Sequence, residues 1–131
     1  MALDLYIKFD IINMEFEIIF YKDKKGNSFI EEFILALGKS NRILAAKTRQ
    51  GIDKLRNKAY HKEPLSKHLE SGLWELRIKA GTDILRIIYT FQKGQIIFLL
   101  HIFIKKKQKT PIGELEIARK RLGEIRIKEA N

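Results

Sequence analysis

Three apolar segments in the second half of the chain, separated by very short turns, constrain the fold most strongly. Residues 73–79, 84–92 and 95–104 are rich in β-branched and aromatic side chains, and each has the length of a strand. Residues 80–83 separate the first two segments, and Lys93-Gly94 separates the last two. Because connections this short make neighbouring strands antiparallel, the sequence predicts a three-stranded antiparallel unit.

Helical patterns lie on both sides of this unit. Ser28 begins an S-x-x-E capping box, and Thr110-Pro111 has the residue types preferred where a helix begins. The other predicted elements are a strand over 15–22, helices over about 29–37, 41–58 and 110–130, and a loop over 60–72. The order β-α-α-β-β-β-α predicts an α+β domain, in which an antiparallel sheet carries an N-terminal two-helix hairpin and a C-terminal helix.

The positive charge of the chain is concentrated in one part of it. Residues 1–38 contain four lysines against seven acidic residues, whereas residues 39–131 contain 22 basic residues against nine acidic ones. The whole chain of 131 residues has a formal charge of +10. A compact domain with such a field attracts polyanions, so a nucleic-acid partner is expected. The alternative is a basic protein whose charge serves only its solubility.

Several classes of protein are excluded by what the sequence lacks. There is no cysteine, which excludes disulfide scaffolds, thiol nucleophiles and thiolate zinc sites. No P-loop, G-x-G-x-x-G or G-x-S-x-G motif is present, and no histidines or carboxylates have metal-ligand spacing, so neither a cofactor nor a metal is expected. No apolar run reaches the ~18 residues of a membrane span, and the N-terminus is unlike a secretory signal, so we expect a cytoplasmic protein.

Each of the three predicted strands places one cationic or ionisable residue among apolar neighbours. These residues are Arg77, Arg86 and His101. A central-strand arginine is costly unless it is paired or faces a wet groove, so a phosphate-binding groove is one explanation. The structural alternative is that the two arginines pair with acidic neighbours, namely Glu75, Glu17 or Asp83.

Several blocks of sequence together resemble the RelE/ParE superfamily of type II toxin–antitoxin toxins. Segment 72–77 (GLWELR) is similar to a signature of its HigB-like, phage-related branch. The other matching blocks are 20–23 with Gly26, 86–89 (RIIY), 99–106 (LLHIFIKK) and 107–117 (KQKTPIGELEI). The resemblance runs from about residue 14 to residue 126, which leaves residues 1–13 as a predicted N-terminal extension of a toxin domain over 14–131.

The resemblance implies a ribosome-dependent mRNA endonuclease that inhibits translation. Such toxins cleave without metal: the ribose 2′-OH attacks the adjacent phosphate, and Arg and Lys stabilise the developing charge. The resemblance also implies a HigA-like antitoxin with a helix-turn-helix domain, which neutralises the toxin in a heterotetramer. The alternatives are a ParE-like toxin that poisons gyrase and a non-enzymatic basic module that binds nucleic acid.

The resemblance also implies roles for individual residues. The two strand arginines of the family match Arg77 and Arg86, and its basic position after the last strand matches Lys105 or Lys106, of which Lys106 is taken as catalytic. The C-terminal helix lacks the tyrosine that RelE carries, so the general base is open among His68, His101 and Glu75, with His68 preferred for its place in the predicted loop. RNA contacts are predicted at the surrounding lysines, which are Lys67, Lys79, Lys105, Lys107 and Lys109.

Overall fold

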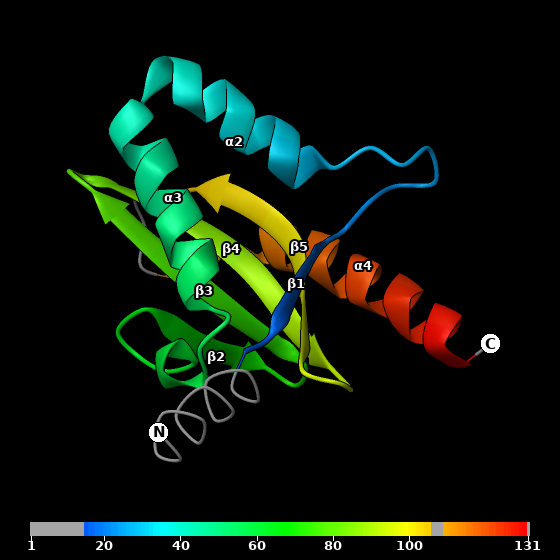
Figure 1. Ribbon diagram of the computed structural model, residues 1–131. Coiled ribbons are helices and arrows are strands. Elements are labelled where there is room, and N and C mark those ends of the chain that lie inside the picture. The colour runs from blue at the N-terminus through cyan, green and yellow to red at the C-terminus, as the bar shows by residue number, and fades with distance from the viewer. Residues whose placement is uncertain (1–14, 106–108, 131) are drawn as a thin grey trace, which may run out of the picture.

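A computed structural model of the protein describes residues 15–105 and 109–130 (Figure 1). Its helices are α2 (Phe29–Ser40), α3 (Arg42–Lys54) and α4 (Ile112–Ala130), with a short 3₁₀ helix, η1, at Lys58–Tyr60. Its strands are β1 (Glu17–Phe20), β2 (Ser66–Glu70), β3 (Leu73–Ala80), β4 (Asp83–Gln92) and β5 (Ile96–Ile104). They form one five-stranded sheet in the order β1-β5-β4-β3-β2. The predicted extension over 1–13 lies outside the described residues.

The structure confirms the predicted α+β class and the antiparallel pairing of β3, β4 and β5. The sheet as a whole is mixed, since β1 pairs with β5 in parallel, a pairing that the predicted antiparallel sheet did not include. A short turn fixes the direction of a hairpin strand, whereas β1 reaches β5 only after the helices and three other strands have intervened. Nothing local in the sequence of β1 therefore specifies its direction.

The predicted loop over 60–72 contains a strand instead. Its segment SKHLE forms β2, which pairs antiparallel with β3 through Ser66↔Leu76 and Lys67↔Glu75. The turn between them needs Gly72, whose φ of +81° is favourable only for glycine. The strand lacks the β-branched residues that usually indicate one, but its polar and charged side chains are typical of the edge of a sheet.

Helices α2 and α3 cover one face of the sheet (Figure 1). The Ser28 hydroxyl accepts a hydrogen bond from the Glu31 amide at 3.2 Å, as the capping box predicts. Asn41 caps α3: helix α2 continues to Ser40, and the Asn41 side chain accepts a hydrogen bond from the Leu44 amide at 3.1 Å. The apolar core under these helices includes Ile30, Ile34, Leu44, Ile52, Leu76, Ile87 and Leu99.

Gly51 lets α3 approach β3 closely. A Cβ atom at this position would lie 2.2 Å from the Cδ1 atom of Ile78, in the packed core. We expect Gly51→Ala to lower the free energy of unfolding by about 1–3 kcal/mol, the usual cost of overpacking. Gly38→Ala in α2 is the control: its Cβ meets no atom within 4 Å, so better helix propensity should stabilise the protein by about 0.5–1 kcal/mol. Urea unfolding of both variants measures the two effects; equal effects would contradict the close approach.

Helix α4 packs on part of the opposite face (Figure 1). Its apolar side chains Ala118, Leu122 and Ile125 form a second core with sheet residues Leu73, Ile88, Leu100 and Phe103. Polar contacts add to this packing: Arg119 holds the Glu70 carboxylate through two hydrogen bonds at 2.7 and 2.9 Å, and Tyr21 donates its hydroxyl to Glu124. Polar residues occupy the same sheet face near the N-terminal end of α4, and they form the candidate site.

Candidate functional site

Strand register gathers cationic side chains on the sheet face that carries α4. Directly paired residues of neighbouring strands point to the same face, about 5 Å apart at Cβ. Arg77 on β3 pairs with Arg86 on β4, which in turn pairs with Phe103 on β5. Glu75 and Lys79 lie two residues before and after Arg77 on β3, and so they point to the same face. Glu75 pairs with Lys67 of β2, and Lys79 pairs with Ile84 of β4. This basic face is defined by Arg77, Arg86, Lys67, Lys79 and Lys105.

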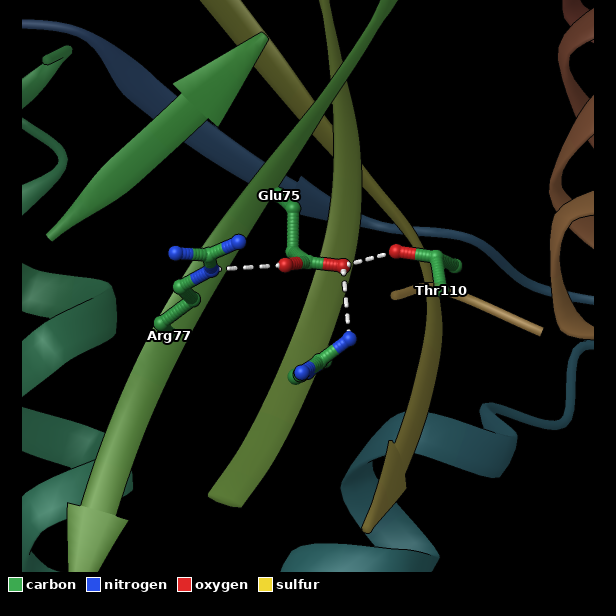
Figure 2. Close-up of polar contacts among 4 residues, drawn as sticks. Glu75, Arg77 and Thr110 are labelled. Carbon is green, nitrogen blue, oxygen red and sulfur yellow. Dashed lines mark hydrogen bonds and ion pairs between the residues drawn. The ribbon is translucent and has the colours of Figure 1, made fainter. Parts of the chain in front are cut away.

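A single buried carboxylate, Glu75, holds the two arginines (Figure 2). Arg77 donates its Nε–H group to Glu75 Oε1 at 2.9 Å, and Arg86 Nη1 lies 3.8 Å from Oε2. The hydroxyl of Thr110, just before α4, donates to Oε2 as well. Figure 2 shows Arg77 and Thr110 approaching the carboxylate from opposite sides. The predicted pairing of both arginines with an acidic neighbour is thus present, and the neighbour is Glu75.

Burial differs sharply among these charged groups. The side chain of Glu75 is 0% exposed and that of Arg86 is 1% exposed, whereas that of Arg77 is 24% exposed. The hydrogen bond to Glu75 uses the Nε–H group of Arg77, and the side chain of this arginine is still partly exposed. A guanidinium has further N–H donors in its terminal amino groups that an anion can use. A guanidinium fixed in this way matches the geometry of a phosphate and needs little reorganisation when the anion arrives.

His101 lies on β5, between the sheet and the first turn of α4. The buried imidazole stacks on Phe103, with ring centroids 5.7 Å apart, and contacts Glu114 of α4 through Nε2. Its Nδ1 atom faces Arg121 Nη1 at 3.4 Å. Because a guanidinium can only donate, Nδ1 must accept and Nε2–H must donate to Glu114, which fixes a neutral tautomer. Burial lowers the pKa of His101, the Arg121 charge acts in the same direction, and Glu114 opposes both.

This tautomer makes the stability of the fold dependent on pH. The pKa of His101 is lowered in the folded state, so the unfolded chain binds more protons as the pH falls through about 6.5. Stability should therefore be full above that value and decline below it. We expect His101→Asn to reduce the slope of unfolding free energy against pH between about 7.5 and 5.5. Urea unfolding across that range tests this, and an unchanged slope would contradict a buried neutral His101.

The structure brings most of the predicted site residues together. Arg77 and Arg86 are adjacent, and the exposed Lys67 and Lys79 lie on the same face. The exposed Lys105 extends the pairing of β5 with β4, because its backbone N–H donates to the Ile84 carbonyl. Lys109 is exposed and precedes Thr110, which contacts Glu75. Lys106 and Lys107 lie outside the described residues.

His68 lies on the other face of the sheet. It is a residue of β2, not of a loop as predicted, and it pairs with Trp74, which belongs to the α2–α3 side. The two rings meet edge to face, with centroids 4.9 Å apart. Successive strand residues point to opposite faces, so the pairing that brings Lys67 toward Glu75 turns His68 away from it.

Two contacts of this site differ from what the sequence predicts. Thr110 was predicted to cap the last helix, but its hydroxyl donates to Glu75 and the Pro111 carbonyl accepts the first helical hydrogen bond, from Leu115, at 3.1 Å. Arg121 also donates to the Leu100 carbonyl at 2.7 Å. Arg121 lies three residues after Ala118 and four before Ile125, both on the buried stripe of α4, and this spacing is the signal that could have indicated its inward position.

Within residues 15–105 and 109–130, no group of three or more His, Asp or Glu side chains is arranged to hold a metal ion. None of the helices there is both long and apolar enough to cross a bilayer.

Most of the chain matches one known protein family. Residues 32–123 match the family described as Phage derived protein Gp49-like (DUF891). A search of curated proteins gives no match. The matched residues extend from α2 into α4 and include Glu75, Arg77, Arg86 and Thr110. Gp49-like proteins are associated with the toxins of toxin–antitoxin systems, which implies an antitoxin partner. The chain belongs to the Gp49-like family of phage-derived proteins, a family of the RelE/HigB-type toxin superfamily.

Proposed function

We propose that this chain is the toxin of a type II toxin–antitoxin system and that it cleaves mRNA on the ribosome without a metal. The observation that carries the proposal is the partly exposed guanidinium of Arg77, fixed by the buried Glu75 beside Arg86 on a lysine-rich face. A HigA-like antitoxin with a helix-turn-helix domain is the proposed partner, in a heterotetramer that keeps the toxin inactive. Such a toxin acts in the cytoplasm, where translating ribosomes are found.

The proposed reaction is an intramolecular phosphoryl transfer within the RNA. The ribose 2′-oxygen attacks the adjacent phosphorus, the bond from phosphorus to the 5′-oxygen breaks, and the products are a 2′,3′-cyclic phosphate and a 5′-hydroxyl. The 2′-OH proton passes to solvent water as the new bond forms, and solvent supplies the proton that the 5′-oxygen takes up as it departs. Negative charge grows on the non-bridging oxygens, where the terminal amino groups of Arg77 would donate hydrogen bonds.

The surrounding charges have distinct tasks in this proposal. Glu75 orients Arg77, and Arg86 supplies fixed positive charge from the buried layer. Lys67, Lys79, Lys105 and Lys109, together with Lys107, bind neighbouring phosphates and set the position of the strand. Lys106 is proposed as a further catalytic cation, the role that the family resemblance implies. His68 faces away from this cluster. Catalysis in this proposal therefore rests on electrostatic stabilisation of the transition state, to which Arg77 contributes most.

Two assays on the purified protein test the proposal against its alternatives. Translation of a reporter mRNA should stop in a cell-free system, with the mRNA cut, while DNA supercoiling by gyrase is unaffected. Inhibition of supercoiling with intact mRNA would favour a ParE-like gyrase poison. RNA binding without cleavage, with or without ribosomes, would favour a non-enzymatic basic module.

A further inference from the structure

A hollow lies beside Arg77, at the edge of β3 that β2 leaves uncovered. Strand β2 begins at Ser66 opposite Leu76, and the segment before it contacts β3 through the hydrogen bond from the Arg77 amide to the Leu65 carbonyl, at 2.8 Å. The hollow measures about 540 Å³, within the range of about 300–1,000 Å³ typical of ligand pockets. Its lining includes Lys54, Tyr60, Pro64, Leu65, Arg77 and Lys79.

The lining combines positive charge with one aromatic ring. Three of its side chains are cations (Lys54, Arg77 and Lys79), and its only acidic residue is Glu63. Tyr60, on the 3₁₀ helix η1, is 39% exposed. The Lys54 ammonium lies over the Tyr60 ring, 5.5 Å from its centroid, so positive charge is held against one face of a partly exposed aromatic side chain.

This combination suits one nucleotide of a single-stranded RNA. Proteins bind single strands by stacking bases on aromatic side chains and following the backbone with cations. A duplex, with its bases already stacked on one another, offers no free base to the Tyr60 ring. Because Arg77 lines the hollow and also belongs to the basic face, one strand can occupy both places at once.

We infer that the hollow is a nucleotide subsite next to the scissile phosphate. The base stacks on the face of the Tyr60 ring opposite Lys54. Lys54 and Lys79 contact the phosphates on either side of the base, and Arg77 lies at the boundary with the reacting group. The inference rests on the proposed function, since it takes RNA as the substrate. It adds that an unpaired base is recognised beside the cut.

Binding of an RNA that cannot be cleaved isolates this subsite from catalysis. The probe is a fluorescently labelled single strand of about a dozen nucleotides, with 2′-O-methyl groups throughout, so that no nucleophile is present. Tyr60→Ala should weaken binding by roughly tenfold or more, the usual loss for one stacked base, whereas Tyr60→Phe should retain the affinity. Leu35→Ala on α2 is the control, because Leu35 is 63% exposed and lies outside the hollow; its affinity should match that of the unaltered chain.

A scan of single abasic positions along the same oligonucleotide identifies the base. Removing the base at one position should weaken binding to the unaltered protein as much as Tyr60→Ala does, and should cost the Tyr60→Ala variant nothing further. Circular dichroism melts establish that the variants remain folded. The subsite is refuted if Tyr60→Ala binds as well as the unaltered protein, if every abasic position affects both proteins equally, or if the unaltered protein does not bind the strand.

Failure of the subsite is distinguishable from failure of the proposed function. Cleavage of ribosome-bound mRNA by the unaltered protein, with unchanged oligonucleotide binding by Tyr60→Ala, overturns the subsite alone. If the unaltered protein neither cleaves mRNA on ribosomes nor binds the oligonucleotide, both are overturned.

Discussion

Replacing Arg77 with alanine is expected to slow mRNA cleavage by roughly 10²–10³-fold, the usual loss when one fixed donor to a developing charge is removed. The loss should appear in the maximal rate on ribosome-bound mRNA, and growth inhibition should disappear with it. Arg77→Lys should restore little activity, because an ammonium lacks the planar pair of donors that matches a phosphate. Quantitative cleavage of a labelled mRNA measures all three proteins.

The fold should tolerate this change, which separates catalysis from stability. In Arg77→Ala, Glu75 would keep its contacts with Arg86 and Thr110, and the lost side chain is already 24% exposed. Arg42→Ala is a matched control, since it removes an exposed arginine from α3, which packs on the opposite face. A less stable Arg77→Ala protein that cleaves at the normal rate would refute the catalytic role and leave Arg77 as a structural ion-pair partner.

Loss of the Glu75 carboxylate should have the largest effect on stability. Glu75→Ala is expected to lower the free energy of unfolding by about 3–5 kcal/mol, because it deprives the buried Arg86 guanidinium of this carboxylate. It also removes the acceptor of the Arg77 and Thr110 hydrogen bonds.

Glu75→Gln makes the stability test more specific. It keeps the shape and one acceptor oxygen but removes the charge, so its loss of stability should be intermediate. Urea unfolding followed by Trp74 fluorescence measures both variants. If Glu75→Ala unfolds at the same urea concentration as the unaltered protein, the carboxylate does not hold the cluster together.

Much of the candidate site could be predicted from strand alternation. The short turns defined β3, β4 and β5, and the period of two then placed Arg77 on the face of Glu75, away from Trp74 and Leu76. The register confirms this arrangement. The turn predicted over 80–83 also fixes the register of the β3–β4 hairpin, since pairing Ala80 with Asp83 places Arg77 opposite Arg86. The convergence of both arginines on Glu75 required the structure.

Two features had no local signal in the sequence. The register between β4 and β5 shifts where Ile88 pairs with His101 and Tyr89 pairs with Leu99, which leaves Leu100 as an extra residue. This bulge places both Leu100 and His101 on the α4 side, whereas alternation alone would separate them. Strand β2 has a polar composition that single-sequence patterns assign to loops, and so the face on which His68 lies could not be foreseen.

The ends of the mRNA fragments test the central claim most directly. A reconstituted translation system is given the purified protein and a defined mRNA, once with ribosomes and once without, and the fragment ends are characterised chemically. The account predicts cleavage only with ribosomes, undiminished by a metal chelator added after translation complexes are assembled and stabilised. The upstream fragments should carry 2′,3′-cyclic phosphates and the downstream fragments 5′-hydroxyls. Intact mRNA in both reactions, or fragments with 5′-phosphates, would contradict it.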